Sequence, residues 1–188
     1  MRWGEPALPI DAELVTKLDG LGWHQIHPDN RPPAGFIEEI ERIVGSTLPA
    51  DYRGFLSHYP CDSGPDKSVV SPIVEGPAGG GNPSLLVCFG HSQDGIWQRL
   101  VNDVDWHIPG MMIIGDDIFG NWFYLDLDAG SVWFFDRDGD GKLARECLAL
   151  VGHNFTDFIL RMEIDEADDL PSPVPTPSLI DHLRDWLI

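Results

Sequence analysis

The sequence predicts an α+β fold, with amphipathic helices and an antiparallel strand pair in one chain. Three observations predict this class. An apolar stripe at helical spacing covers residues 36–44, strands rich in aromatic residues flank a short glycine-containing connection within residues 122–135, and a second helical stripe follows Asn154. The short connection indicates a hairpin, so these neighbouring strands are expected to be antiparallel.

Three helices are predicted in the first third of the chain. The first follows Asp11 and ends at the glycines after residue 19, the second covers residues 36–44 and stops at Gly45, and the third opens at Leu48-Pro49. Asp51 then lies in a first turn, where the helix dipole favours an anion. The residues expected to face the core are Leu14, Val15, Leu18, Leu21, Phe36, Ile37, Ile40, Ile43, Val44, Tyr52, Phe55, Leu56 and Tyr59.

The middle of the chain is expected to form the sheet. Residues 60–83 are rich in Gly, Pro, Ser and Asp and predict a long loop with a short strand at 68–75. The further expected elements are a strand at 85–89, a helix at 92–105, strands at 111–114, 122–127 and 131–135, and a strand at 143–151. Within the first hairpin strand, alternation places Trp122 and Phe123 on opposite faces.

The end of the chain has a different composition. After the helix that Asn154 caps, residues 165–169 are acidic except for one alanine, and prolines follow at alternate positions up to Pro177. This composition predicts an extended Pro-rich spacer, followed by a short C-terminal helix from Ser178 onward. The expected organisation is an N-terminal helix and connector (1–34), a central domain (35–164) and the spacer with its helix (165–188).

Composition restricts the class of partner. The 31 acidic and 12 basic side chains give a formal net charge of −19, which repels phosphate backbones and anionic lipid surfaces. We therefore expect neither nucleic acid nor membrane as a partner. The three cysteines are far apart and form no CxxC pair, and no secretory signal begins the sequence, so a cytoplasmic location is expected.

Motifs for chemistry are incomplete. Residues 136–141 copy the first half of a calcium-binding EF-hand loop, but Cys147 stands where a bidentate glutamate is required and an aromatic strand precedes the loop. Gly79-Gly80-Gly81 lacks the Gly-Lys-Ser/Thr ending of a phosphate-binding loop, and the pair His24 and His27 has no accompanying ligands. Asp116-Asp117 is interpreted as an exposed turn rather than a catalytic pair. The sequence predicts no enzyme, no metal and no cofactor.

A set of short motifs in a fixed order carries a family resemblance. The helix at 37–45 leads into Leu48-Pro49-Ala50-Asp51-Tyr52, and later come Ile114-Gly115-Asp116-Asp117, Trp133-Phe134-Phe135-Asp136 and Asn154-Phe155-Thr156-Asp157-Phe158. This order resembles the SMI1/KNR4 family of the SUKH superfamily over roughly residues 35–162. The resemblance implies an α+β domain whose central antiparallel sheet packs against helices. It also implies a bacterial immunity protein that binds and neutralises a secreted polymorphic toxin, often a nuclease.

The function expected from these observations is non-enzymatic inhibition of a basic protein toxin, because opposite potentials accelerate encounter and select the partner. The residues proposed for the toxin-facing surface are Asp116, Asp117, Asn121, Trp122, Asp136, Asp138 and Asp140. The alternative for these residues is that Trp122 belongs to the core and the aspartates solvate turns. Two other functions stay open: a cytosolic regulatory or scaffold protein that uses residues 165–188, and a metal-dependent hydrolase.

Overall fold

The computed structural model describes the helices and most of the sheet. The described residues are 8–23, 34–59, 68–74, 76, 83, 87–88, 96, 99–100, 107–117, 119–137 and 143–164. Several expectations lie outside them: the connector at 24–33, most of the loop at 60–83, most of the helix at 92–105, the turn at 138–142, and the spacer and helix at 165–188. Of the predicted helix at 92–105, the described residues Ile96, Arg99 and Leu100 are helical.

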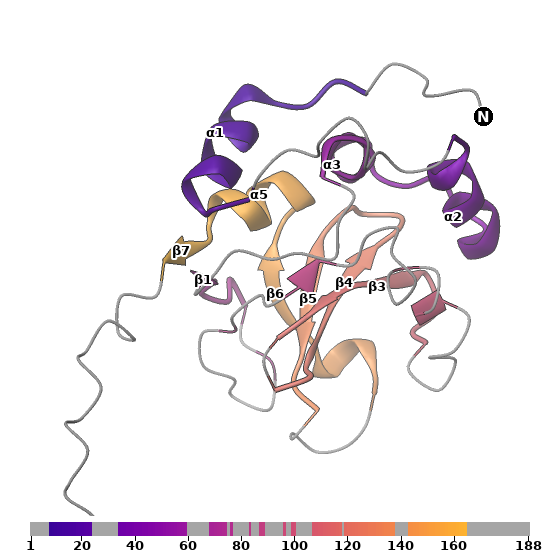
Figure 1. The fold of residues 1–188 in the computed structure, drawn as a ribbon. Helices are drawn as coiled ribbons and strands as arrows, with labels where there is room; N and C mark the ends of the chain where they lie inside the picture. Colours follow the sequence, from indigo (N-terminus) through magenta and orange to yellow (C-terminus); the bar gives the residue numbers. More distant parts are fainter. Residues whose placement is uncertain are drawn as a thin grey trace, which may run out of the picture.

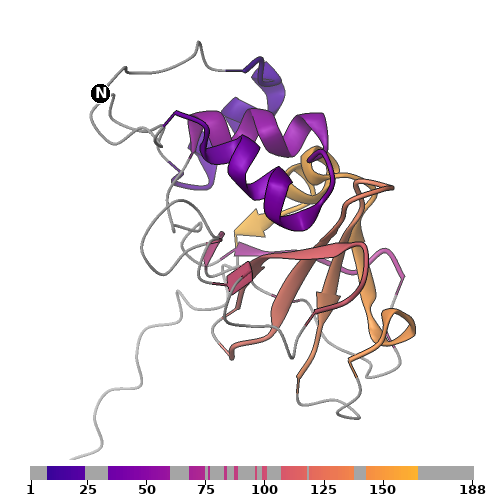
Figure 2. The same ribbon diagram turned by 90° about the vertical axis from the view of Figure 1, so that its right-hand side faces the viewer.

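The structure is α+β, with helices gathered on one side of an antiparallel sheet (Figures 1 and 2). The helices are α1 (Ala12–Gly20), α2 (Phe36–Val44), α3 (Ala50–His58) and α5 (Phe155–Leu160), with a 3₁₀ turn η3 (Arg145–Cys147). The strands are β1 (Ser68–Val69), β2 (Val87–Cys88), β3 (Met111–Asp116), β4 (Trp122–Asp126), β5 (Val132–Phe135), β6 (Ala149–Gly152) and β7 (Glu163–Ile164).

The main sheet has five strands in the order β2-β3-β4-β5-β6, and every neighbouring pair is antiparallel. A second, two-stranded sheet pairs β1 with β7. β4 lies in the middle of the main sheet, and all five of its residues are buried. Alternation along β4 therefore separates two faces that are both covered, and neither face of this strand is solvated.

The helices begin and end where the sequence predicts. The Asp11 side chain caps α1 by accepting from the amide of Glu13 at 2.8 Å, and the Asn154 side chain caps α5 by accepting from the amide of Asp157 at 2.7 Å. Gly45 ends α2 with a φ of 70°, a left-handed conformation that glycine adopts without steric cost. These caps satisfy helix-end amides and carbonyls that would otherwise lack partners.

Aromatic side chains join the helices to one another and to the sheet. Phe155 of α5 lies between Phe55 and Tyr52 of α3, with ring centroids 4.7 and 4.9 Å apart respectively. Phe158 of the same helix contacts Phe123 of β4 at 5.4 Å. All five rings are at most 1% exposed, so α5 connects the helical layer to the sheet through fully buried contacts.

The N-terminal segment packs against this helical layer. Leu14 and Leu18 of α1 are buried, and the amide of Leu8 donates to Ser57 Oγ of α3 at 3.2 Å. The segment approaches α3 so closely that a Cβ on Gly54 would lie 2.6 Å from the carbonyl oxygen of Pro9. Although we expected a helix and connector ahead of the central domain, the helix shares that domain's core.

The strand predicted for residues 143–151 is shorter than expected. Arg145–Cys147 form a 3₁₀ turn, and β6 begins only at Ala149. The turn brings the Arg145 guanidinium to the buried carboxylate of Asp126, with which it forms an ion pair. This pairing is a tertiary contact, which the local sequence pattern does not reveal.

Candidate partner-binding surface

One end of the main sheet brings together most of the residues proposed for the toxin-facing surface. Asp116 pairs with Trp122 across β3 and β4, and Trp122 pairs with Phe135 across β4 and β5. The β3–β4 turn (residues 117–121) and residues 136–137 after β5 therefore lie next to each other. Asp138 and Asp140 lie outside the described residues.

The β3–β4 turn is organised around the carboxylate of Asp117, which is only 4% exposed. Its Oδ1 accepts from the amides of Phe119 and Asn121, both at 2.8 Å, and its Oδ2 accepts from the Asn121 side-chain amide at 2.9 Å. The backbone also closes on itself, because the Asp117 amide donates to the Asn121 carbonyl at 3.0 Å. Asp117 is thus a structural residue of the turn, as aspartates that bond to amides a few residues on commonly are.

Arg137 joins this turn to the strand beside it. Its amide donates to Asn121 Oδ1 at 2.9 Å and its Nη1 donates to the Gly120 carbonyl at 3.3 Å. Its guanidinium carbon lies 5.1 Å from the centroid of the Trp122 ring, a cation–π distance. Two separate segments therefore hold the turn in one conformation.

Asp116 lies at the margin of this surface, with a side chain 19% exposed. Burial raises the pKa of its carboxyl above the ordinary value, and the neighbouring Asp117 adds to this, while Arg99, at 3.7 Å, acts in the opposite direction. Asp136 is half-buried.

The exposed turn expected at Asp116-Asp117 is wrong for Asp117. Asp117, Asn121 and Trp122 are 4%, 8% and 4% exposed, and the side chains of Asp117 and Asn121 bond to the backbone of the turn and of Arg137. The sequence showed an Asp pair beside Gly and Asn, which is typical of solvated turns, but not that the turn folds over the carboxylate. That these residues meet a partner stays a prediction, and the structure places three of them inside the protein.

Sequence reasoning missed Phe119, the side chain that this turn exposes. It is 75% exposed, more than any other large apolar side chain among the described residues. A signal was present, because an aromatic residue directly before Gly120 occupies the tip of a connection, where polar residues are usual. Arg137 was missed as well, since it was considered only within the incomplete EF-hand motif.

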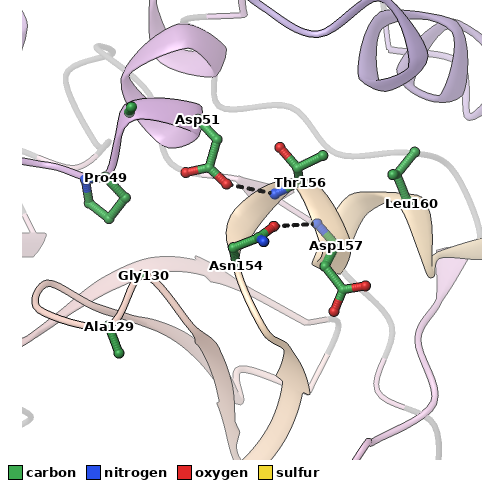
Figure 3. Close-up of a pocket in the computed structure, with 9 residues that line it drawn as sticks. Pro49, Asp51, Ala129, Gly130, Asn154, Thr156, Asp157 and Leu160 are labelled. Carbon is green, nitrogen blue, oxygen red and sulfur yellow. Dashed lines mark hydrogen bonds between the residues drawn. The ribbon is translucent and has the colours of Figure 1, made fainter.

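The opposite end of β4 borders an open hollow of about 590 Å³ between the first turns of α3 and α5 and the β4–β5 turn (Figure 3). Asp51 Oδ2 accepts from the Thr156 amide at 2.9 Å, and Asp157 Oδ2 accepts from the His153 amide at 2.8 Å. Both carboxylates thus bond to backbone amides at the start of α5. Asp51 thus connects α3 to the start of α5, and Asp157 stabilises the start of its own helix.

Within the described part of the chain, His, Cys, Asp and Glu side chains form no group of three that could hold a metal ion. Among the same residues, no helix has both the length and the apolar character needed to cross a membrane.

The fold agrees with a comparison against protein families. The model of the SMI1 / KNR4 family (SUKH-1) matches residues 34–161, which is more than half of the chain. The chain belongs to this family. No curated protein matches it significantly. The match begins after α1, whose Leu14 and Leu18 are part of the same core as the matched residues.

Proposed function

We propose that this protein is a cytoplasmic immunity protein that binds a cognate secreted toxin and neutralises it without catalysing a reaction. Membership of the SMI1/KNR4 family is the observation that carries the proposal, because bacterial members of this family act mostly as immunity proteins. The net charge of −19 supports a basic partner, such as a nuclease whose active site attracts nucleic acid.

The acidic end of the sheet is the proposed docking region. Asp116 and Asp136 border the β3–β4 turn, and Asp138 and Asp140 follow within four residues of Asp136. Negative charge concentrated on one surface can steer a basic partner into one orientation, whereas charge on separate helix faces only raises the overall potential. Asp117, Asn121 and Trp122 have a different role in this proposal, because they shape the turn from inside.

The test is co-expression with the toxin domain of the neighbouring gene. We expect that gene to encode a long secreted protein with a C-terminal toxin domain, and we expect this chain to restore growth of cells that produce the domain. The purified proteins should bind, with an association rate that falls steeply as salt rises. Growth arrest that persists despite abundant soluble chain, together with no binding in vitro, contradicts the proposal.

A matched pair of variants separates the surface from the net charge. Replacing Asp136, Asp138 and Asp140 by Asn changes the net charge from −19 to −16, and so does Glu13→Gln with Asp19→Asn and Asp128→Asn at exposed positions elsewhere. The first variant should slow association by about tenfold, while the second should change it by less than about twofold. If both variants slow association equally, the acidic residues at 136–140 are not the docking surface.

A further inference from the structure

The β3–β4 turn presents an aromatic side chain to solvent at high cost. Phe119 is 75% exposed, while the other aromatic residues that the structure describes are buried or half-buried. A phenylalanine side chain gains substantially from leaving water, so an exposed one has stabilisation still to gain on binding. The other strongly exposed large apolar residues of the described part are aliphatic and belong to other elements, because Val74 bridges to Leu150 of β6 and Ile164 pairs with Ser68 of β1.

The amides of Phe119 and Gly120 are both hydrogen-bonded within the turn. The Phe119 amide donates to Asp117 Oδ1 at 2.8 Å, and the Gly120 amide donates to the Asp117 carbonyl at 3.1 Å. Gly120 has a φ of 79°, which other residues adopt only with strain, and its carbonyl accepts from Arg137. Because the turn is already ordered, docking through Phe119 costs little backbone entropy.

The charges around Phe119 define the complementary surface. Asp116, Asp117 and Asp136 lie at this end of the sheet together with two guanidiniums, that of Arg99 beside Asp116 and that of Arg137, which contacts Gly120 and the Trp122 ring. The sequence continues with Asp138 and Asp140, so carboxylates outnumber these guanidiniums. An exposed aromatic side chain at the same end of the sheet as charged groups has the composition of an interface hot spot, in which a central anchor fills a pocket and the rim excludes water. The matching partner has an apolar pocket bordered by lysine or arginine.

We propose that Phe119 is the anchor of the partner interface and inserts into an apolar pocket with a basic rim on the toxin. This inference rests on the proposed function and adds to it the residue that carries the binding energy. The acidic residues then govern the rate of association, and Phe119 governs the rate of dissociation.

The experiment measures binding of the full chain to the purified, catalytically inactivated toxin domain of the neighbouring gene. Phe119→Ala should weaken the Kd by about 30-fold or more, mainly by faster dissociation, and Phe119→Leu should recover part of the loss. The controls are Val74→Ala and Ile164→Ala, which truncate side chains 55% and 56% exposed elsewhere and should change the Kd by less than about threefold. Unchanged unfolding midpoints show that each variant is folded.

The possible failures are distinguishable. If the wild-type chain does not bind the toxin domain, the proposed function fails and the anchor with it. If the wild type binds and Phe119→Ala binds within threefold of it, only the anchor is overturned. If sedimentation shows that wild type self-associates, that Phe119→Ala is a monomer, and that both bind toxin equally, the residue is a contact between copies and the anchor is again overturned.

Discussion

The two turns at the ends of β4 are built in the same way and end in different surroundings. In the β3–β4 turn, buried Asp117 accepts from the amides of Phe119 and Asn121. In the β4–β5 turn, Asp126, only 1% exposed, accepts from the amides of Asp128 and Ala129, both at 3.0 Å. Each turn therefore folds over a carboxylate that satisfies its backbone.

The difference lies in what each turn faces. The β4–β5 turn lies beside the helices, where Gly130 approaches Pro49 and Arg145 pairs with Asp126. The β3–β4 turn exposes Phe119 at its tip. Phe119 is therefore exposed in a turn whose Phe119, Gly120 and Asn121 amides are hydrogen-bonded to Asp117. A hydrogen-bonded turn with an uncovered aromatic side chain has the properties of a recognition element.

The largest loss of stability is expected in the β4–β5 turn, which lies beside the helices. Asp126→Ala leaves two amides without their acceptor and removes the partner of Arg145, and should lower the free energy of unfolding by about 3 kcal/mol. Urea denaturation measures this value. The exposed neighbour provides the control, since Asp128→Ala should change stability by less than about 0.5 kcal/mol. Equal losses in the two variants would show that the carboxylate of Asp126 does not hold the turn.

Asp117 tests whether a buried carboxylate also stabilises the β3–β4 turn. Asp117→Ala should cost about 2 kcal/mol, because three donors lose their acceptor but no ion pair is broken within the described contacts. Asp117→Asn keeps one acceptor oxygen and should lose less. In urea denaturation, the free energy of unfolding should decrease from wild type to Asp117→Asn to Asp117→Ala. An Ala variant as stable as wild type would show that the Asp117 carboxylate does not stabilise its turn.

Gly54 tests whether the N-terminal segment packs tightly against α3. Gly54→Ala places a Cβ 2.6 Å from the Pro9 carbonyl oxygen and forces the segment to shift, which should cost about 1 to 2 kcal/mol. Gly20→Ala is the matched control, because a Cβ there meets nothing within 4 Å. Thermal unfolding should separate the two variants, and a Gly54→Ala variant as stable as the control would mean that the segment does not press on α3.

The smallest effect is the pH dependence of stability that Asp116, beside the β3–β4 turn, contributes. Because burial raises the pKa of the Asp116 carboxyl, the folded protein holds this proton more tightly than the unfolded chain does. The ionised carboxylate therefore destabilises the fold at neutral pH, and this cost disappears as the pH falls below the unfolded-chain pKa of about 3.9. Asp116→Asn should be slightly more stable than wild type at pH 7, with a gain that shrinks towards pH 4. Unfolding midpoints of both proteins between pH 7 and pH 4 measure this difference. A stability gain of Asp116→Asn that grows on acidification would contradict the raised pKa of Asp116.

Much of the fold could be predicted from local patterns. The stripe at 36–44 and the stop at Gly45 define α2, and the cap at Asn154 defines the start of α5, because these signals depend only on residues a few positions apart. The central hairpin was predicted for the same reason. The 3₁₀ turn at Arg145 was not, since it depends on Asp126, which is 19 residues away.

The candidate surface was chosen from the sequence, but the roles of its residues could not be read there. The aspartates at 116–117 and 136–140 indicated a candidate surface, yet a carboxylate that faces solvent and one that faces its own backbone look alike in a sequence. Asp117 and Asp116 are adjacent, and only the first is enclosed by the turn. Phe119 was missed because its exposure depends on that enclosure.

Hydrogen–deuterium exchange of the full chain, with and without the inactivated toxin domain, shows which turn of the sheet meets the toxin. Toxin binding should slow exchange in the β3–β4 turn at residues 117–121 and in residues 136–137, while exchange in the β4–β5 turn at 126–130 stays unchanged. Slower exchange confined to the β4–β5 turn and the starts of α3 and α5, with residues 117–121 unaffected by bound toxin, would contradict this prediction.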